Sequence, residues 1–443
     1  MLRLIVYQFQ YSKRQWFGTI PLLLVSSLIV GTSLFGITSS SRISNINASQ
    51  LFQMLIIFGG ITLFFLISNN IRLLIDIFKK DYELWTILGA SKSQLSLLVA
   101  GQFSIMAVIV SSFGTILSFV VTDSYYKFLQ NLLGRDELPD LVITSNIQTV
   151  LLSILIVPTI VGLGAYFYSI RLLKKESNSK SNGRNWRVKA TKFINISVRL
   201  FLWLLCIGII ISAGFTNNRE VIVTQSGMIL LLLITHILIT HILIIQVLSP
   251  STQICLIKLL MKILPSENYA INTSFWNLLY NPSYLKSIQT SMTMGVTLIS
   301  GFILYTRNMY SFMNTINSVH EARASFIAYL SAPIVLIITS FISITILSSN
   351  KDIEDIRQLQ ILGTTKLQLF KIRIAEAIMH SIIISFVSVI FNAIVLMLVR
   401  FIGQRLGQSL AEIAGFWQPS LIILCLLVIF YSITKGFYLF KDR

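Results

Sequence analysis

Charged residues are scarce in this sequence: Asp, Glu, Lys and Arg make up 12% of its 443 residues. A soluble domain carries charge on about a quarter of its residues, which excludes water as the main solvent for this chain. Cysteine is scarce as well, since the chain has three, Cys206, Cys255 and Cys425, without a CxxC spacing. We therefore predict neither a disulfide framework nor a zinc site, and expect the three side chains to be small buried hydrophobic groups.

Motifs for ATP binding and catalysis are absent too. No G-x-x-x-x-G-K-[ST] sequence occurs, so the chain is not expected to bind the phosphates of ATP. Nothing resembles a nucleophile, base and orienting group, so catalysis by this chain is not expected.

His236 and His241 are five residues apart, which places them about 140° apart around a helix. That angle does not suit a shared metal, and we expect these histidines to form hydrogen bonds between helices or to line a polar cavity.

Hydrophobic residues make up 54% of the chain and gather in ten long apolar runs. A hydrocarbon core about 30 Å thick is crossed by about 20 apolar residues in a helix. The runs lack the alternation of membrane barrel strands, and lipid cannot satisfy an exposed backbone, so they predict an all-α polytopic membrane protein. They cover residues 16–37, 51–73, 97–121, 147–172, 194–215, 228–248, 287–305, 326–348, 374–399 and 421–440.

The net charge of +18 has a topological explanation. If the N-terminus is cytoplasmic, the Lys and Arg clusters fall on one side and the opposite loops are nearly bare of them. This positive-inside pattern predicts that both termini are cytoplasmic. The basic segment Arg171 to Lys192 is rich in Ser, Asn and Gly. We expect a flexible cytoplasmic linker there that contacts anionic membrane lipid and no nucleic acid.

One short segment occurs twice: ELWTILGASKSQL begins at Glu83, and RQLQILGTTKLQL begins at Arg357. The two align without a gap, and six of the nine positions from Ile87 and Ile361 onward are identical. Each copy lies between two apolar runs, which predicts two related four-helix units. The expected organisation is 1–172 for the first unit, 173–193 for the linker, 194–248 for a central helix pair, 249–286 for an interfacial elbow segment and 287–443 for the second unit.

Each copy predicts a helical elbow that faces the cytoplasm. Gly89 and Gly363 are expected to end one helical turn, because glycine tolerates positive φ. Ser91 and Thr365 are expected to cap the next helix. The apolar residues of each copy are expected to lie against the membrane or a partner and to leave Lys92 and Lys366 exposed. These apolar residues are Ile87, Leu88 and Leu95 in the first copy, and Ile361, Leu362 and Leu369 in the second.

The two copies resemble the signature of FtsX-like permeases, the MacB-type or mechanotransmission class of ABC transporters, E-x-x-I-L-[RK]-x-L-G-A-[ST] followed by a basic residue. The ten-run layout resembles the BceB-type branch, and Asn272 to Lys286 resembles the elbow helix of that family. Two departures stand out. The family's large outer domains are missing, since Thr38 to Gln50 and Thr306 to Ser325 are expected to be short loops. Glu83 is matched by Arg357, so a shared acidic role is not implied.

The resemblance implies a permease subunit in the bacterial cytoplasmic membrane, driven by two copies of a separate ABC ATPase. ATP and Mg would be bound by that partner, and no cofactor is expected in this chain. The implied substrate is amphipathic or lipophilic, such as an antimicrobial or signalling peptide that is exported or removed in immunity. The implied ATPase-coupling residues are Glu83, Ile87, Leu88, Gly89, Ala90, Ser91, Lys92, Arg357, Ile361, Leu362, Gly363, Thr364, Thr365 and Lys366.

Two alternatives stay open. A non-transporting regulator would relay ATPase motion to an outer-face hydrolase or sensor kinase through residues 123–146 and 400–419. An ion-coupled secondary transporter would also use a duplication, and Pro158 and Pro333 would then break its helices.

Two intramembrane polar residues at matching positions are further candidates. Glu376 aligns with Gln102 of the first unit. We expect Glu376 to reach the membrane interface or to pair with Lys371 or Arg373.

Overall fold

The fold is all-α throughout the part of the chain that the computed structural model describes, as expected from the apolar runs. Four helices are long and apolar enough to cross a membrane, namely Phe17–Arg42, Lys92–Leu132, Ile147–Ile170 and Lys366–Ile390. They indicate a membrane protein. The described residues are 5–7, 9–10, 16–43, 46–134, 138–180, 254–263, 268–280, 293, 296, 327, 331–347, 358–405, 417, 421, 425, 428, 429, 432 and 433.

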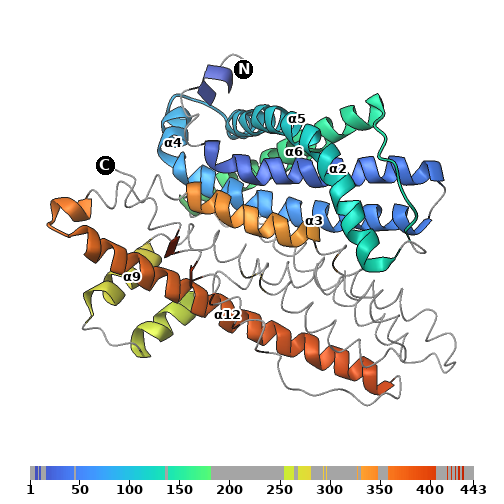
Figure 1. Cartoon of the computed structure of the whole chain (residues 1–443). Helices are drawn as coiled ribbons and strands as arrows, with labels where there is room; N and C mark the ends of the chain where they lie inside the picture. The colour runs from blue at the N-terminus through green and yellow to red at the C-terminus, as the bar shows by residue number, and fades with distance from the viewer. Residues whose placement is uncertain are drawn as a thin grey trace.

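The N-terminal part forms a bundle of four long helices (Figure 1). They follow a 3-10 turn, η1 (Phe17–Thr19), and are α2 (Ile20–Ile43), α3 (Ile46–Ile77), α5 (Lys92–Leu133) and α6 (Ile147–Lys180). The short helix α4 (Lys79–Ile87) joins α3 to α5. Helix α2 contacts α3, α5 and α6, and α5 also packs along α6. The bundle therefore buries α2 from several sides.

Small residues let α2 and α5 approach closely. A Cβ at Gly31 would overlap Ser118, and a Cβ at Gly114 would overlap Ser27. The two serine hydroxyls donate to carbonyl oxygens of their own helices, so these polar groups are satisfied inside the bundle. Small residues are favoured at such contacts because helices in lipid associate by close packing.

The C-terminal part contributes α9 (Tyr269–Tyr280), α12 (Lys366–Arg405), a helix at residues 254–263 and the helix Ser331–Leu347. Figure 1 shows α12 running below the N-terminal bundle, with α9 against its first half. The helix Ser331–Leu347 packs on the N-terminal bundle. The Leu22 N–H donates to Ser343 Oγ at 3.1 Å, and the Tyr125 and Ser331 hydroxyls are 2.9 Å apart. Segments far apart in the sequence therefore share one core.

Several helices are longer than the apolar runs predicted. The expected loop at residues 38–50 is helical up to Ile43 and again from Ile46. The linker expected to be flexible from Arg171 begins as helix, because α6 continues to Lys180. Leu, Arg, Lys and Glu are good helix formers, and extending an existing helix requires no new nucleus.

The two prolines do not break their helices. Helix α6 continues through Pro158. Pro333 is helical as well, within the described stretch Ser331–Leu347. The broken helices expected of a secondary transporter are therefore not found at these positions.

The expectation of buried cysteines was wrong for two of the three. Cys255 and Cys425 are exposed. Cys206 lies outside the described residues, as do the central helix pair at 194–248 and the outer loop at 306–325. The ten-helix count and the two-unit plan stay predictions.

Candidate functional site

The first elbow ends α4 in a left-handed glycine, as its sequence predicted. Gly89 has a φ of 91°. Its N–H donates to the Thr86 carbonyl at 3.1 Å, and the N–H of Ala90 donates to the Trp85 carbonyl at 2.9 Å. These two bonds form a Schellman motif, which satisfies carbonyl groups that the end of a helix would otherwise leave free.

The second elbow has the same backbone geometry. Gly363 has a φ of 89°. Its N–H donates to the Gln360 carbonyl at 3.0 Å, and the N–H of Thr364 donates to the Leu359 carbonyl at 3.1 Å. The Ile-Leu-Gly segment therefore folds into one helix-ending turn at two distant places in the chain.

A capping box opens the helix after each elbow. Ser91 Oγ accepts from the Gln94 N–H at 3.2 Å, and the Ser91 N–H donates to Gln94 Oε1 at 2.8 Å. In the second elbow, Thr365 and Gln368 form the same two bonds, at 3.3 and 2.9 Å. The hydroxyl predicted as a cap is confirmed in both copies, and the glutamine three residues later completes each box.

Each elbow presents a pair of large apolar side chains to its surroundings. Ile87 and Leu88 are 81% and 79% exposed, and Ile361 and Leu362 are 77% and 80% exposed. Leu95 and Leu369 do not join this surface, contrary to expectation, because both are only 2% exposed. They lie in the first turn of the capped helix, on the face that packs on other helices, whereas the nearby Leu367 is 64% exposed.

The lysines and the acidic residue beside the elbows lie at the surface. Lys366 and Glu83 are exposed, and Lys92 is half-exposed. Arg357, the counterpart of Glu83, lies outside the described residues, as do His236 and His241. Within the described part of the chain, no group of three or more His, Cys, Asp or Glu side chains is placed to hold a metal ion.

An aromatic cluster anchors the first elbow. The fully buried Trp16 stacks on Phe78, with ring centroids 6.1 Å apart, and meets Phe103 edge-on at 4.8 Å. Phe78 in turn lies 6.0 Å from Tyr82 of α4. Trp16 therefore joins the chain just before the elbow to the helix just after it. Trp16 was not among the site residues predicted from sequence, although a tryptophan at the start of the first apolar run was a visible signal.

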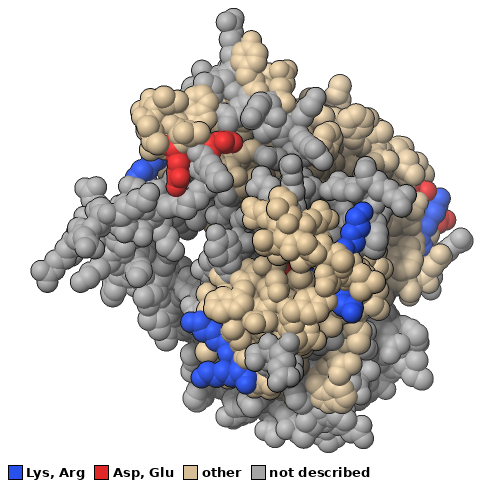
Figure 2. Space-filling view, turned by 90° about the vertical axis from the view of Figure 1, so that its left-hand side faces the viewer, with Lys and Arg blue, Asp and Glu red and all other residues tan. Residues whose placement is uncertain are grey.

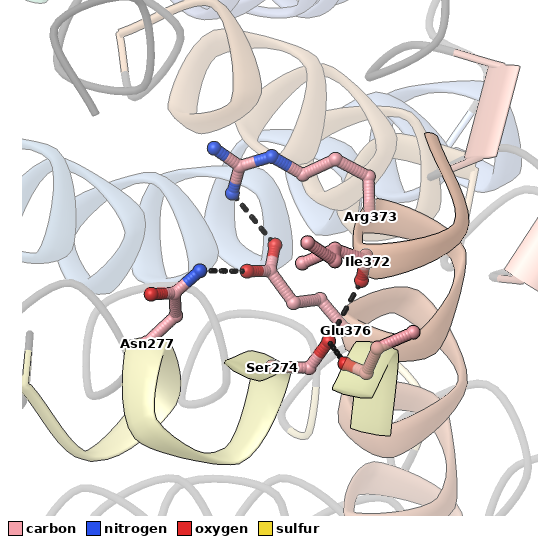
Figure 3. Close-up of polar contacts among 6 residues, drawn as sticks. Ser274, Asn277, Ile372, Arg373 and Glu376 are labelled. Atoms are coloured by element: carbon pink, nitrogen blue, oxygen red, sulfur yellow. Dashed lines mark hydrogen bonds and ion pairs between the residues drawn. The ribbon is translucent and has the colours of Figure 1, made fainter. Parts of the chain in front are cut away.

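A buried polar network anchors the second elbow, as Figure 3 shows. Arg373 Nη1 lies 2.7 Å from Glu376 Oε2, and both side chains are less than a tenth exposed. Asn277 of α9 donates to Glu376 Oε1 at 2.9 Å. Ser274, one turn earlier in α9, donates to the Ile372 carbonyl of α12 at 2.8 Å. The predicted pairing of Glu376 with Arg373 is confirmed, and the Glu376 side chain is buried.

Gln102, which aligns with Glu376 in the sequence, is neutral. Gln102 is 1% exposed, and its Nε2 has no hydrogen-bond partner in the part of the chain that the structure describes. Asn277 and Ser274 fall in the segment that resembled an elbow helix, but their partners could not be deduced from sequence. The two elbows therefore share a backbone and differ in their anchors.

These features describe two rigid turns, each held to the body of the protein and each exposing two aliphatic side chains. Such a surface suits binding to a partner. No protein-family model, curated protein or solved structure matches the chain.

Proposed function

We propose that this chain is the membrane subunit of an ABC transporter, a permease of the FtsX-like, MacB-type class. Its two elbows would seat two copies of a separate ATPase, which binds ATP and Mg. Closure of the ATPase dimer would push on both elbows and tilt the helices that follow them. The full permease would have ten helices in two related units, with both termini on the cytoplasmic side of a bacterial membrane.

The observation that carries this proposal is the exposed Ile-Leu pair at the same position of two elbows of the same shape. Full burial of one such side chain is worth about 1.5–3 kcal/mol. Scattered exposed apolar residues are common. Two matched pairs on two rigid turns favour a partner with two equivalent pockets.

The anchors of the elbows support the same proposal. A push on an elbow is transmitted only if the turn does not yield. The Schellman motifs, the capping boxes, Trp16 and the Arg373–Glu376 pair all restrain the turns. A force on Gly89 or Gly363 would therefore act on α5 or α12 directly.

The substrate that fits this proposal is amphipathic or lipophilic, such as an antimicrobial or signalling peptide. The described outer segments are short, since α2 ends at Ile43 and α3 begins at Ile46. A substrate that partitions into the membrane needs no large outer domain for its capture.

Affinity purification from native membranes tests the proposal. Wild-type chain should retain an ABC ATPase, identified by its Walker A peptide, in a ratio of two copies to one chain. The variant Ile361→Ser with Leu362→Ser should lose at least one copy and keep its thermal stability, because the replaced side chains are exposed. Ile147→Ser is the matched control, because Ile147 is 75% exposed and begins α6, far from either elbow. A permease that turns over its substrate without any ATPase would contradict the proposal.

A second candidate function is regulation of an outer-face partner without transport, and one observation favours it. Helix α5 has 42 residues, which is about 63 Å of helix against a hydrocarbon core of about 30 Å. The far end of α5 packs against the segment that follows it. Tyr126 donates to the Pro139 carbonyl at 2.7 Å, and Gln130 Nε2 donates to Asp140 at 2.9 Å.

This outer end has a small apolar cluster of its own, formed by Ala48, Leu51, Phe52, Tyr126, Leu129, Leu138 and Leu141. A rod that runs from the elbow to an ordered outer cap would carry motion to a hydrolase or sensor. ATP turnover in proteoliposomes separates the two functions. Stimulation by a peptide substrate alone favours transport, and stimulation that requires an outer-face protein favours regulation.

A further inference from the structure

The helical residues 254–263 pack beside α9 and α12 and have an exposed face. Its Ile257 is fully buried in a cluster with Phe275 and Leu278 of α9 and with Met379 and Ile383 of α12. Other residues of the helix, including Ile254 and Met261, pack on the same cluster. One face of this helix is therefore buried against α9 and α12.

The opposite face has a basic edge and an apolar edge. At 100° per residue, Lys258 and Lys262 fall side by side on one edge, and Leu259 and Ile263 fall on the other. The two lysines are exposed, and Leu259 and Ile263 are 49% and 70% exposed. The described residues place no carboxylate within salt-bridge distance of either lysine. This division of charge is typical of a helix lying in a membrane interface.

Helix α9, which packs on the same buried cluster, exposes two aromatic residues. Tyr269 and Trp276 are seven residues apart on the face opposite the buried Ser274, and both are largely exposed. Tyr and Trp gather at the headgroup level of membranes, where one side of the ring is apolar and the other polar. Figure 2 views this end of the molecule and shows blue basic side chains beside broad tan surface.

We propose that helix 254–263 is an anionic-lipid binding site, in which Lys258 and Lys262 hold lipid phosphates. Leu259 and Ile263 would enter the adjoining acyl region, and Trp276 and Tyr269 would set the depth of the helix pair. A protein surface is a poorer fit, because the basic edge and the apolar edge lie side by side around the helix, as a lipid headgroup and its acyl chain do.

This site would fix the second elbow relative to the membrane. Helix 254–263 packs on α9, and Asn277 of α9 bonds to Glu376, ten residues after Lys366 at the start of α12. Lipid bound here would hold α9 at the membrane surface. The binding itself does not depend on the proposed ATPase.

Cys255 provides a reporter on the same face, because it is exposed and falls between Lys262 and Leu259 around the helix. The full chain with Cys206→Ser and Cys425→Ser would be spin-labelled at Cys255. It would then be reconstituted in vesicles of phosphatidylcholine with increasing phosphatidylglycerol. Label depth is measured by collision with oxygen against a water-soluble nickel chelate.

The label should move deeper as phosphatidylglycerol increases. Lys258→Gln or Lys262→Gln should each raise the phosphatidylglycerol fraction at half-maximal change about fivefold, and the double variant should abolish the change. Lys127→Gln is the matched control, an exposed lysine at the far end of α5. The proposal is overturned if the label depth does not change with the phosphatidylglycerol fraction. It is also overturned if Lys127→Gln changes the response as much as Lys258→Gln or Lys262→Gln does. Shielding of Cys255 only by a bound ATPase also overturns it, in favour of a protein-docking surface.

Discussion

Gly89 and Gly363 adopt the same left-handed backbone conformation, with φ of 91° and 89°, in two turns with the same pair of hydrogen bonds. The residues after them form matching capping boxes, and the residues before them expose matching aliphatic pairs. The duplication found in the sequence is therefore a duplication of local structure. Its proposed purpose is to seat two identical ATPase subunits.

Gly363→Ala should destabilise the second elbow by about 1–2 kcal/mol, because an L side chain is strained at this φ. The loss is measured as a lower melting temperature in detergent, and ATPase retention should fall with it. Gly60→Ala is the matched control, since Gly60 is helical and a Cβ there would meet no atom within 4 Å. Equal melting temperatures for both alanine variants would show that the turn does not need glycine.

Removing the cap hydroxyls should weaken the start of α5 and α12. Ser91→Ala and Thr365→Ala each lose the bond to the N–H of a glutamine, which is worth about 1 kcal/mol. Ser112→Ala should be nearly neutral, because Ser112 lies inside α5 and bonds only to the Val108 carbonyl of its own helix. Hydrogen exchange at the first turn of α12 would report the difference, and unchanged exchange in Thr365→Ala would contradict the role of the box.

Glu376→Gln should destabilise the protein by about 3–5 kcal/mol, because it removes the carboxylate from the buried Arg373. A substitution at the aligned position, Gln102, is expected to have the opposite effect on stability. Gln102→Leu should be neutral or stabilising, since Gln102 Nε2 is buried without a partner among the described residues. Thermal unfolding of the two variants side by side checks both statements. A larger loss of stability in Gln102→Leu than in Glu376→Gln would contradict the role of Glu376 as an anchor.

Tyr82 should make stability fall at alkaline pH. Burial, with a further contribution from Asp81, raises the pKa of the Tyr82 phenol well above its usual 10. The unfolded chain then loses this proton at a lower pH than the folded chain, so stability declines as the pH rises above about 10. Tyr82→Phe should show a smaller decline between neutral and alkaline pH in denaturation curves. An identical decline in both proteins would exclude Tyr82 as its source.

The elbows were predictable because their geometry is local. A glycine that ends one turn, a hydroxyl two residues later and a glutamine three residues after that interact within a few residues. No distant part of the chain is needed to form these bonds. The sequence pattern could not show which elbow leucines are exposed, and Leu95 and Leu369 proved to be buried.

Contacts between distant helices, unlike the local Arg373–Glu376 pair, were beyond prediction for the opposite reason. Asn277 and Glu376 are joined across 99 positions of sequence, and Leu22 and Ser343 across 321. Contacts of this kind depend on which helix faces meet. The exposure of Cys255 and the helical start of the expected linker are decided in the same way.

The sequence by itself determined the class of this protein and its repeated turn, because apolar length selects membrane helices and short-range bonds select the elbow. Only the tertiary structure decided that Trp16 anchors one elbow and the Arg373–Glu376–Asn277 network the other. It also decided that Lys258 and Lys262 share a face with Leu259 and Ile263 left open to the surroundings. The reason is physical: which face of a helix is buried depends on its neighbours, and its own residues only limit the choice.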